Sequence, residues 1–267
     1  MKTATIGCTT RPFNAIPYEE AFDLIAAAGY TDVALFANAG VLPIRSDSSR
    51  EEVVAVRTAA RQSGLVPSMV LGRTHLKDGV NEALSQYRKL IERAAEVGAN
   101  WLLDLGTGDE ALYEVYFQLM SQAAPYAQEA GLQITMKPHG GISLTTEDLL
   151  KAVQRVDHPA FAISYDPGNI IYYTAGQRMP GEDIAALKSL VSTLIIKDCT
   201  LREGKPDVLV TPGDGLVNFA TVWRNLVAGG FVGPAYVECV APGSVEQITR
   251  NITYALGFMR GIMVGPE

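Results

Sequence analysis

The chain reads Ala28-Gly29-Tyr30-Thr31-Asp32-Val33-Ala34-Leu35-Phe36, an amphipathic stretch that ends in a glycine and is followed at once by an apolar run. The same arrangement recurs at Gly64 before 66–71, at Gly98 before 101–105 and at Gly131 before 132–136. The four glycines are 35, 34 and 33 residues apart. A glycine in such a place can end a helix in the left-handed conformation before the chain enters a buried strand. The spacing is the length of one strand, one helix and two loops, so it predicts repeated βα units.

The rest of the chain continues these units with less regular spacing. We predict further strands at 3–8, 161–165, 194–197 and 235–239, with helices around 146–153, 185–191, 219–227 and 245–259. A doubly wound open sheet also uses such units, but eight strands in about 260 residues favour closure into a barrel. The first strand is not followed by Gly-x-Gly-x-x-Gly, which argues against a dinucleotide site. The predicted fold is therefore a single-domain (β/α)₈ TIM barrel that spans residues 1–267.

Composition narrows the class of protein. A chain of 267 residues, 48% of them hydrophobic, can bury one large core. Its net charge of -7 gives no general attraction to nucleic acid or to an anionic membrane surface, so the expected partner is a small molecule. The sequence contains neither a secretory signal nor an apolar run long enough for a membrane helix. Cys8, Cys199 and Cys239 are an odd number and widely spaced, which fits buried thiols in a reducing, cytoplasmic setting.

Polar side chains gather where the predicted strands end. In a TIM barrel the reactive groups come from the carboxyl ends of the strands. The residues found there are Lys137 and His139 after the fifth strand, Asp166 and Asn169 after the sixth, Lys197 and Asp198 after the seventh, Glu238 after the eighth, and His75 after the third. These are the candidate site residues.

Five motifs in order carry a resemblance to a known family. They are Met136-Lys137-Pro138-His139-Gly140-Gly141, Tyr165-Asp166-Pro167-Gly168-Asn169, Ile195-Ile196-Lys197-Asp198, Pro212-Gly213-Asp214-Gly215 and Tyr236-Val237-Glu238. Together they resemble the sugar phosphate isomerase/epimerase family, which has the xylose isomerase-like barrel, and the resemblance covers nearly the whole chain. The abasic-site endonucleases share this fold but use a histidine-rich zinc site, which three histidines cannot build.

The resemblance implies a divalent-metal site that this sequence only half retains. Relatives hold Mn²⁺ or Mg²⁺ with Glu, Asp, His and Glu on strands five to eight. Asp166 and Glu238 match this pattern, whereas Lys137 replaces the first Glu and Ile195 replaces the His. A glutamate usual on the second strand is also missing, because Ala34 stands there. Two carboxylates beside an ammonium are a poor dication site, so we expect no resident metal and only a weak affinity for Mn²⁺ or Mg²⁺.

The exchange at Lys137 suggests that a lysine ammonium supplies the charge that a metal would bring. We hypothesise that Lys137 and Lys197 polarise or anchor a substrate carbonyl, hydroxyl or carboxylate near Asp166, while Glu238 moves a proton at the adjacent carbon. His139, Asn169, Asp198 and His75 are predicted substrate contacts. The predicted function is an isomerase or epimerase acting on a sugar, keto-sugar or polyol derivative, without a tightly bound metal.

Other interpretations of the same residues remain. One is a lyase or dehydratase acting on an oxidised sugar or keto-glycoside. Another is a non-catalytic barrel that binds a sugar-like ligand or serves as a partner subunit, with Lys137 in a purely structural ion-pair network. Tyr172 and Tyr173 either stack on a sugar or simply pack. The sequence is compatible with a homo-oligomer and does not define its size.

Overall fold

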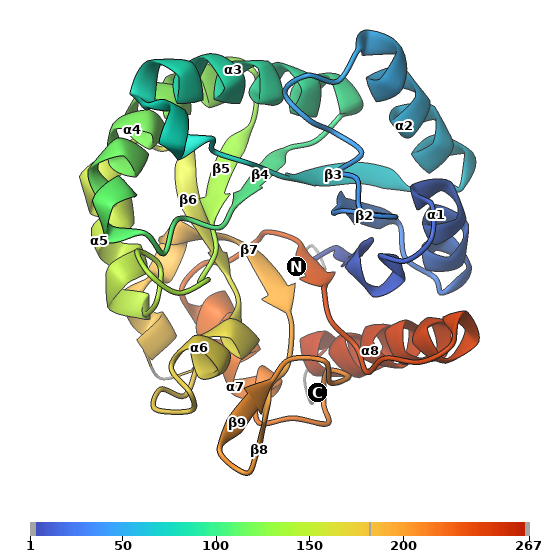
Figure 1. Ribbon diagram of the computed structural model, residues 1–267. Helices are drawn as coiled ribbons and strands as arrows, with labels where there is room; N and C mark the ends of the chain where they lie inside the picture. The colour runs from blue at the N-terminus through green and yellow to red at the C-terminus, as the bar shows by residue number, and fades with distance from the viewer. Residues whose placement is uncertain (1–3, 182, 265–267) are drawn as a thin grey trace.

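The computed structural model describes residues 4–181 and 183–264, and within them eight parallel strands close into a barrel (Figure 1). The order around the barrel is β1-β10-β7-β6-β5-β4-β3-β2. Its strands are β1 (Ile6–Thr9), β2 (Asp32–Leu35), β3 (Val66–Leu71), β4 (Trp101–Asp104), β5 (Gln133–Met136), β6 (Phe161–Tyr165), β7 (Val191–Ile196) and β10 (Ala235–Val237). The predicted barrel is therefore confirmed. Residue 3, predicted to begin the first strand, lies outside the described residues.

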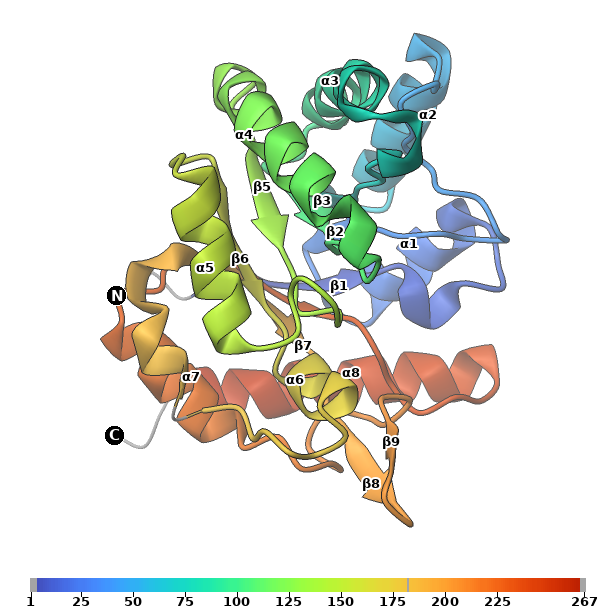
Figure 2. The same ribbon diagram turned by 60° about the vertical axis from the view of Figure 1, so that its left-hand side comes forward.

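Helices between the strands form the outer ring of the barrel (Figure 1, Figure 2). They are α1 (Tyr18–Ala27), α2 (Arg50–Gln62), α3 (Val80–Val97), α4 (Tyr113–Glu129), α5 (Thr146–Val156), α7 (Phe219–Ala228) and α8 (Val245–Val264), with a short α6 (Pro167–Tyr173). None of the helices in the described residues combines the length and hydropathy needed to cross a bilayer.

The four repeating glycines lie where the sequence predicted. Gly98 ends α3 with a φ of 104°, and the other three follow their helices with φ between 74° and 94°. These angles are accessible to glycine without steric cost, so the chain can turn sharply from each helix into the next strand.

Two apolar layers hold the barrel together. The larger one lies between the sheet and the outer helices and contains two of the three buried free cysteines, Cys8 and Cys199. The smaller one fills the barrel interior and consists of Ala34, Phe36, Met69, Leu103, Ile195 and Tyr236. Hydroxyl pairs complete the interior, because Thr193 donates to Ser164 over 2.8 Å and the Ser68 and Tyr236 hydroxyls are 2.8 Å apart. Charged groups at the carboxyl ends of the strands therefore lie directly above a closely packed barrel interior.

The unit between β6 and β7 differs from the prediction. The predicted helix around 185–191 is wrong, since that stretch holds two short 3-10 helices, η4 (Asp183–Ala186) and η5 (Lys188–Leu190). Val191 already belongs to β7, where it pairs with Ile163 of β6. The helix of this unit is α6, which begins directly after Asp166 because Asp166 caps it and Pro167 suits its first turn.

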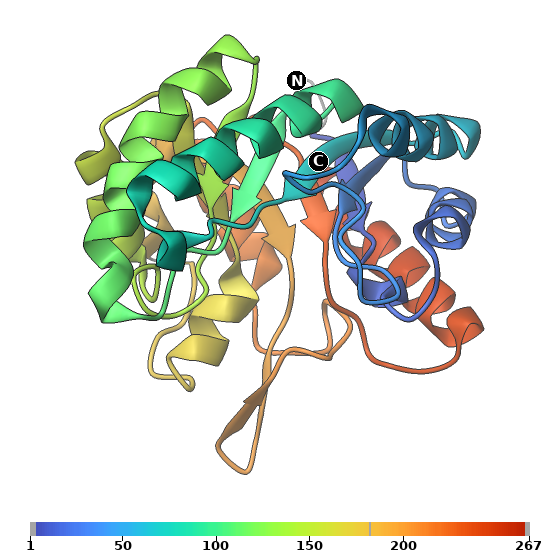
Figure 3. The same cartoon turned by 45° about the horizontal axis from the view of Figure 1, so that its top comes forward.

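A hairpin that the sequence analysis did not anticipate follows β7. It is formed by β8 (Thr200–Arg202) and β9 (Lys205–Asp207), which pair antiparallel. Figure 3 shows it projecting beyond the barrel on the side to which the barrel strands point. The carboxyl face of the barrel is thus walled on one side by α6 and this hairpin.

Candidate active site at the carboxyl ends of the strands

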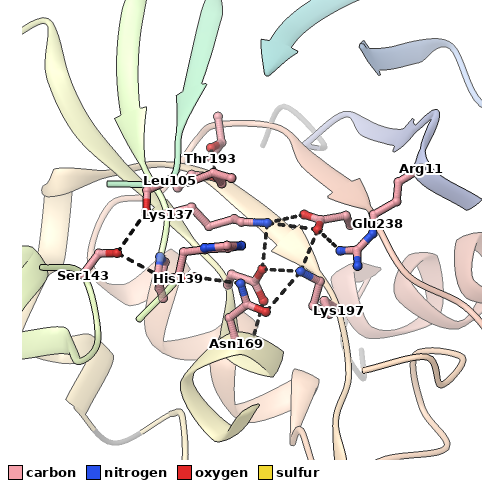
Figure 4. A network of polar contacts seen from close by, with 12 residues as sticks. Arg11, Leu105, Lys137, His139, Ser143, Asn169, Thr193, Lys197 and Glu238 are labelled. Atoms are coloured by element: carbon pink, nitrogen blue, oxygen red, sulfur yellow. Dashed lines mark hydrogen bonds and ion pairs between the residues drawn. The ribbon is translucent and has the colours of Figure 1, made fainter. Parts of the chain in front are cut away.

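Four predicted site residues meet at the barrel mouth. Lys137, Asp166, Lys197 and Glu238 each follow the last residue of their strand, β5, β6, β7 and β10, respectively. All four side chains are buried. Figure 4 shows Lys137, Lys197 and Glu238 pointing toward one another. The rule that reactive groups gather at the strand ends therefore selected residues that the structure brings together.

Each of the two lysines contacts both carboxylates. Lys137 Nζ lies 2.7 Å from Glu238 Oε2, 2.9 Å from Glu238 Oε1 and 3.4 Å from Asp166 Oδ2. Lys197 Nζ lies 2.9 Å from Asp166 Oδ2 and 2.6 Å from Glu238 Oε1. Lys137 thus occupies the place between the two carboxylates that the sequence assigned to it.

Arg11 joins this group and was missed by the sequence analysis. It begins the 3-10 helix η1 (Arg11–Phe13) just beyond β1, and its Nη1 donates to Glu238 Oε1 over 2.7 Å. Its position two residues past the end of β1 was the signal that could have found it, since every barrel strand delivers residues to this mouth. We call Arg11, Lys137, Asp166, Lys197 and Glu238 the charged cluster. With three cations and two carboxylates, it carries one net positive charge.

Burial and charge act in opposite directions on these groups. Burial alone would raise the pKa of Glu238, but Lys137, Lys197 and Arg11 outweigh it and hold that pKa well below its usual range. Burial would likewise lower the pKa of Lys197, but Asp166 and Glu238 prevail and raise it. For Lys137, burial and the repulsion from Lys197 together lower the pKa against the pull of the carboxylates. Glu238 is consequently ionised at neutral pH.

Asn169 anchors the Asp166 side of the cluster. Its backbone N–H donates to Asp166 Oδ1 over 3.0 Å, and its side-chain Oδ1 accepts from Lys197 Nζ over 3.2 Å. Its side-chain Nδ2 donates to the Pro138 carbonyl oxygen over 2.7 Å. The predicted candidate Asn169 therefore belongs to the site, with its own hydrogen-bonding groups already engaged.

His139 lies at the edge of the cluster, partly exposed. Its ring packs against Tyr173, with 5.0 Å between ring centroids, and Tyr172 packs edge-on against Tyr173. Burial and the nearby ammonium groups of Lys137 and Lys197 lower the pKa of His139 to about 4. The imidazole is thus neutral at pH 7, and it can donate or accept a hydrogen bond without adding charge.

Asp198, a predicted substrate contact, makes no contact with the charged cluster among the described residues. Its buried carboxylate accepts hydrogen bonds of 2.8–2.9 Å from the backbone N–H groups of Cys199, Gly213, Gly215 and Val217. These four donors leave it the role of a loop anchor. It holds the Pro212-Gly213-Asp214-Gly215 turn against the end of β7.

His75 and Asp104 also lie apart from the charged cluster. His75 lines cavities beside α3, where its Nδ1 is 4.0 Å from Asp78, and no contact in the described residues joins it to the cluster. Its prediction as a substrate contact of this site is therefore not supported. Asp104, at the end of β4, is buried and accepts hydrogen bonds from the Tyr87 and Tyr116 hydroxyls.

The donor set does not suit a divalent metal. Among the described residues no group of three or more His, Cys, Asp or Glu side chains could hold one. Lys137 Nζ contacts both carboxylates that match metal ligands in the resembling family, and Ile195 is packed into the barrel interior. An ammonium that bridges the two carboxylates repels a divalent cation, so these residues do not fit a resident metal.

Comparisons with known proteins agree on the fold. A family model described as xylose isomerase-like TIM barrel matches residues 22–261. No curated protein matches the sequence.

Solved structures share this barrel at low sequence identity. A D-psicose 3-epimerase from Clostridium cellulolyticum H10, solved with D-tagatose, superposes with a TM-score of 0.77 at 15% identity, covering 97% of this chain and 99% of its own. A xylose isomerase-like TIM barrel protein from Mycobacterium smegmatis, in complex with magnesium, gives 0.76 at 18% identity and covers 98% of each chain. A sugar phosphate isomerase/epimerase from Parabacteroides distasonis gives 0.72 at 15%, covering 100% and 96%.

Proposed function

This chain belongs to the xylose isomerase-like TIM barrel family, and we propose that it is an isomerase or epimerase acting on a sugar, keto-sugar or polyol derivative. The proposed reaction is proton transfer at the carbon beside a carbonyl. The positive charge that stabilises the intermediate comes from lysine ammonium groups of the chain itself.

One observation carries this proposal. Lys137 and Lys197 each contact both Asp166 and Glu238 at the buried mouth of the barrel. Fixed cations in a site with little water stabilise a developing oxyanion more strongly than mobile or hydrated ones. The cluster therefore combines a carboxylate with a nearby fixed positive charge, as an enediolate intermediate requires.

The proposed first step moves one proton and two electron pairs. Glu238 accepts the proton from the substrate carbon, and the electron pair of that C–H bond forms the carbon–carbon double bond of the enediolate. The carbonyl electrons then move to the oxygen, where Lys137 or Lys197 stabilises the charge. Returning the proton to the former carbonyl carbon, while the adjacent hydroxyl proton passes to the oxyanion, gives an isomer. Delivery of a proton to the original carbon from the other face, by a second acid or by water, gives an epimer.

Glu238 needs one of its contacts to loosen before it can accept a proton. Both of its oxygens are bound, and three cations make it a weak base. The side chain of Arg11 is the most exposed of these partners, at 39%, against 2% for either lysine. Exchange of the Arg11 contact for a substrate is therefore the least costly way to weaken the hold of the cations on the carboxylate.

The test is proton exchange without metal. The purified protein is assayed for bound Mn²⁺, Mg²⁺ and Zn²⁺ by mass spectrometry, then incubated with keto-sugars in D₂O with and without EDTA. We expect less than one metal per chain and substrate-dependent deuterium incorporation at a carbon-bound position that EDTA does not change. Loss of incorporation with EDTA and recovery with Mn²⁺ would overturn the proposal, and release of water in place of isomer formation would point to a lyase.

A second candidate is a barrel that binds a sugar-like ligand without turning it over. The observation in its favour is that the ammonium groups of Lys137 and Lys197 are already satisfied by Asp166, Glu238 and Asn169. Such mutual satisfaction is also what a purely structural ion-pair network looks like. Saturable binding with no deuterium incorporation for any bound sugar would favour this candidate.

A further inference from the structure

Arg11 is the cation of the charged cluster with the most hydrogen-bond donors to spare. Its Nη1 binds Glu238, while its Nε and Nη2 make no hydrogen bond to any described residue. The side chain is 39% exposed, whereas the other four members are buried. A guanidinium offers five donors in a planar fork, so most of this fork is available to a ligand.

The ion pair with Glu238 positions the Arg11 guanidinium, and local contacts hold the backbone from which the side chain extends. Its N–H donates to the Thr9 hydroxyl over 3.3 Å, and Pro12 fixes the start of η1. The carbonyl of Phe13, at the end of η1, accepts from the Asn38 side chain over 3.0 Å. An anchoring cation positioned in advance loses less conformational freedom on binding.

Arg11 and Glu238 line one cavity of about 480 Å³ between the loops after β1 and β10. Much of its wall is apolar and is provided by Pro12, Phe13, Ile16, Val240, Pro242 and Ile248. Among its lining residues, all within the described part of the chain, Glu238 is the single carboxylate and Arg11 the single cation. The volume suits a small molecule with a carbon skeleton along the apolar wall.

Charge and geometry together define the group that Arg11 can take. The charged cluster has one net positive charge, which one monoanionic group would neutralise. A planar fork matches the two oxygens of a carboxylate. A phosphate dianion would favour a second cation, and the residues that line the cavity supply none. A carboxylate is therefore the better fit.

We propose that Arg11 anchors a carboxylate of the substrate, and that the cavity between the β1 and β10 loops holds the carbon skeleton next to it. This inference rests on the proposed function, whose substrate class it narrows to oxidised sugars and related small hydroxy acids. Binding draws Arg11 from Glu238 toward the ligand. Glu238 Oε1 then keeps the two lysine contacts but loses its third cationic partner, which makes the carboxylate a stronger base.

The experiment measures binding to matched pairs of compounds that differ by one carboxylate. Isothermal titration calorimetry is run with D-glucuronate against D-glucose, and with D-galacturonate against D-galactose. D-glucose 6-phosphate provides a phosphate comparison. We expect the wild type to prefer at least one acid over its neutral partner by about tenfold or more, as a charge-assisted hydrogen-bonded pair predicts.

Three variants test whether Arg11 causes the preference for the acids over the neutral sugars. Arg11→Ala should reduce the acid preference to within about twofold, and Arg11→Lys, which keeps the charge without the fork, should retain part of it. The Lys variant also serves if the Ala variant does not fold. Arg202→Ala removes an exposed arginine from the projecting hairpin and should change nothing.

The proposal and the proposed function can fail separately. Equal affinity within both pairs, a preference that survives in both Arg11 variants, or a phosphate bound tenfold more tightly than glucuronate would each overturn the carboxylate anchor. Carboxylate-dependent binding without deuterium incorporation would keep the anchor and reject the isomerase. Turnover of neutral sugars without a preference for carboxylates would keep the isomerase and reject the carboxylate anchor.

Discussion

Asp166 and Glu238 bind the same two lysines, but their remaining contacts differ. Asp166 caps α6 and accepts the Asn169 N–H, and Asn169 in turn binds Lys197 and the Pro138 carbonyl. Glu238 instead accepts from the partly exposed Arg11 and lines a cavity. The Asp166 half is thus held by buried partners, one of them a backbone N–H, whereas the Glu238 half has a partly exposed partner that can be exchanged.

We infer from this difference that the two carboxylates have different roles: Asp166 positions Lys197, and Glu238 takes part in the reaction. A carboxylate locked by a helix N-terminus and an asparagine suits the task of holding Lys197 in place. A carboxylate beside a cavity can meet a substrate. We therefore expect changes on the Glu238 side to affect turnover most, and changes in the shared lysines to affect stability.

The largest expected effect is on turnover in Glu238→Gln. The amide keeps the shape but cannot accept a proton, so kcat should fall by about 10²- to 10⁴-fold, the range for loss of a general base. The measurement is deuterium incorporation or isomer formation at saturating substrate. Glu246→Gln, a change at an exposed glutamate on α8, is the matched control and should leave kcat unchanged. A Glu238→Gln variant with full turnover would contradict the assignment of the proton acceptor.

The next effect is on stability in Lys137→Met. Methionine keeps most of the side-chain length but removes the ammonium that contacts Asp166 and Glu238, which leaves Lys197 as the one fully buried cation of the charged cluster beside two buried carboxylates. Breaking a buried ion pair on one side costs about 3–5 kcal/mol of unfolding free energy. Urea denaturation measures it directly.

Lys151→Met provides the comparison for that measurement. Lys151 is 75% exposed and pairs with Asp148 at 3.6 Å, so its loss should cost well under about 1 kcal/mol. Equal losses in the two variants would mean that the charged cluster is hydrated and that Lys137 contributes no buried charge.

The sequence predicted the strand-end members of the charged cluster because a strand end is a local property. Lys137, Asp166, Lys197 and Glu238 each follow an apolar run directly. Arg11 was missed because it lies two residues beyond its strand, at the start of η1, where side-chain direction depends on backbone angles that residue type does not reveal.

Asp198 has hydrogen-bond partners that its place in the sequence does not reveal. It stands directly after Lys197 at a strand end, yet the N–H groups that occupy it lie up to 19 residues further along the chain. Only the folded loop brings them together. The short helix α6 was different, since Asp166 followed by Pro167 is a recognisable helix start that could have been predicted.

The smallest expected effect is on the pH dependence of stability, through His139. Burial and then the lysine ammonium groups lower the pKa of His139 from 6.5 to about 4 in the folded protein. Between these two values the unfolded chain binds a proton at this residue and the folded protein does not, so stability falls as the pH falls from about 6.5 to about 4. Above this window the contribution of His139 is complete and constant.

His139→Asn should remove that part of the pH dependence. Comparing urea midpoints at pH 7.0 and pH 5.0, we expect the wild type to lose more stability than the variant between the two values. The effect is modest because the imidazole is partly exposed and solvent screens the repulsion from Lys137 and Lys197. If the variant loses as much stability as the wild type, the field of the charged cluster does not reach His139. A substrate at that edge would then meet an ordinary histidine that gains charge near pH 6.5, in place of a neutral hydrogen-bonding group.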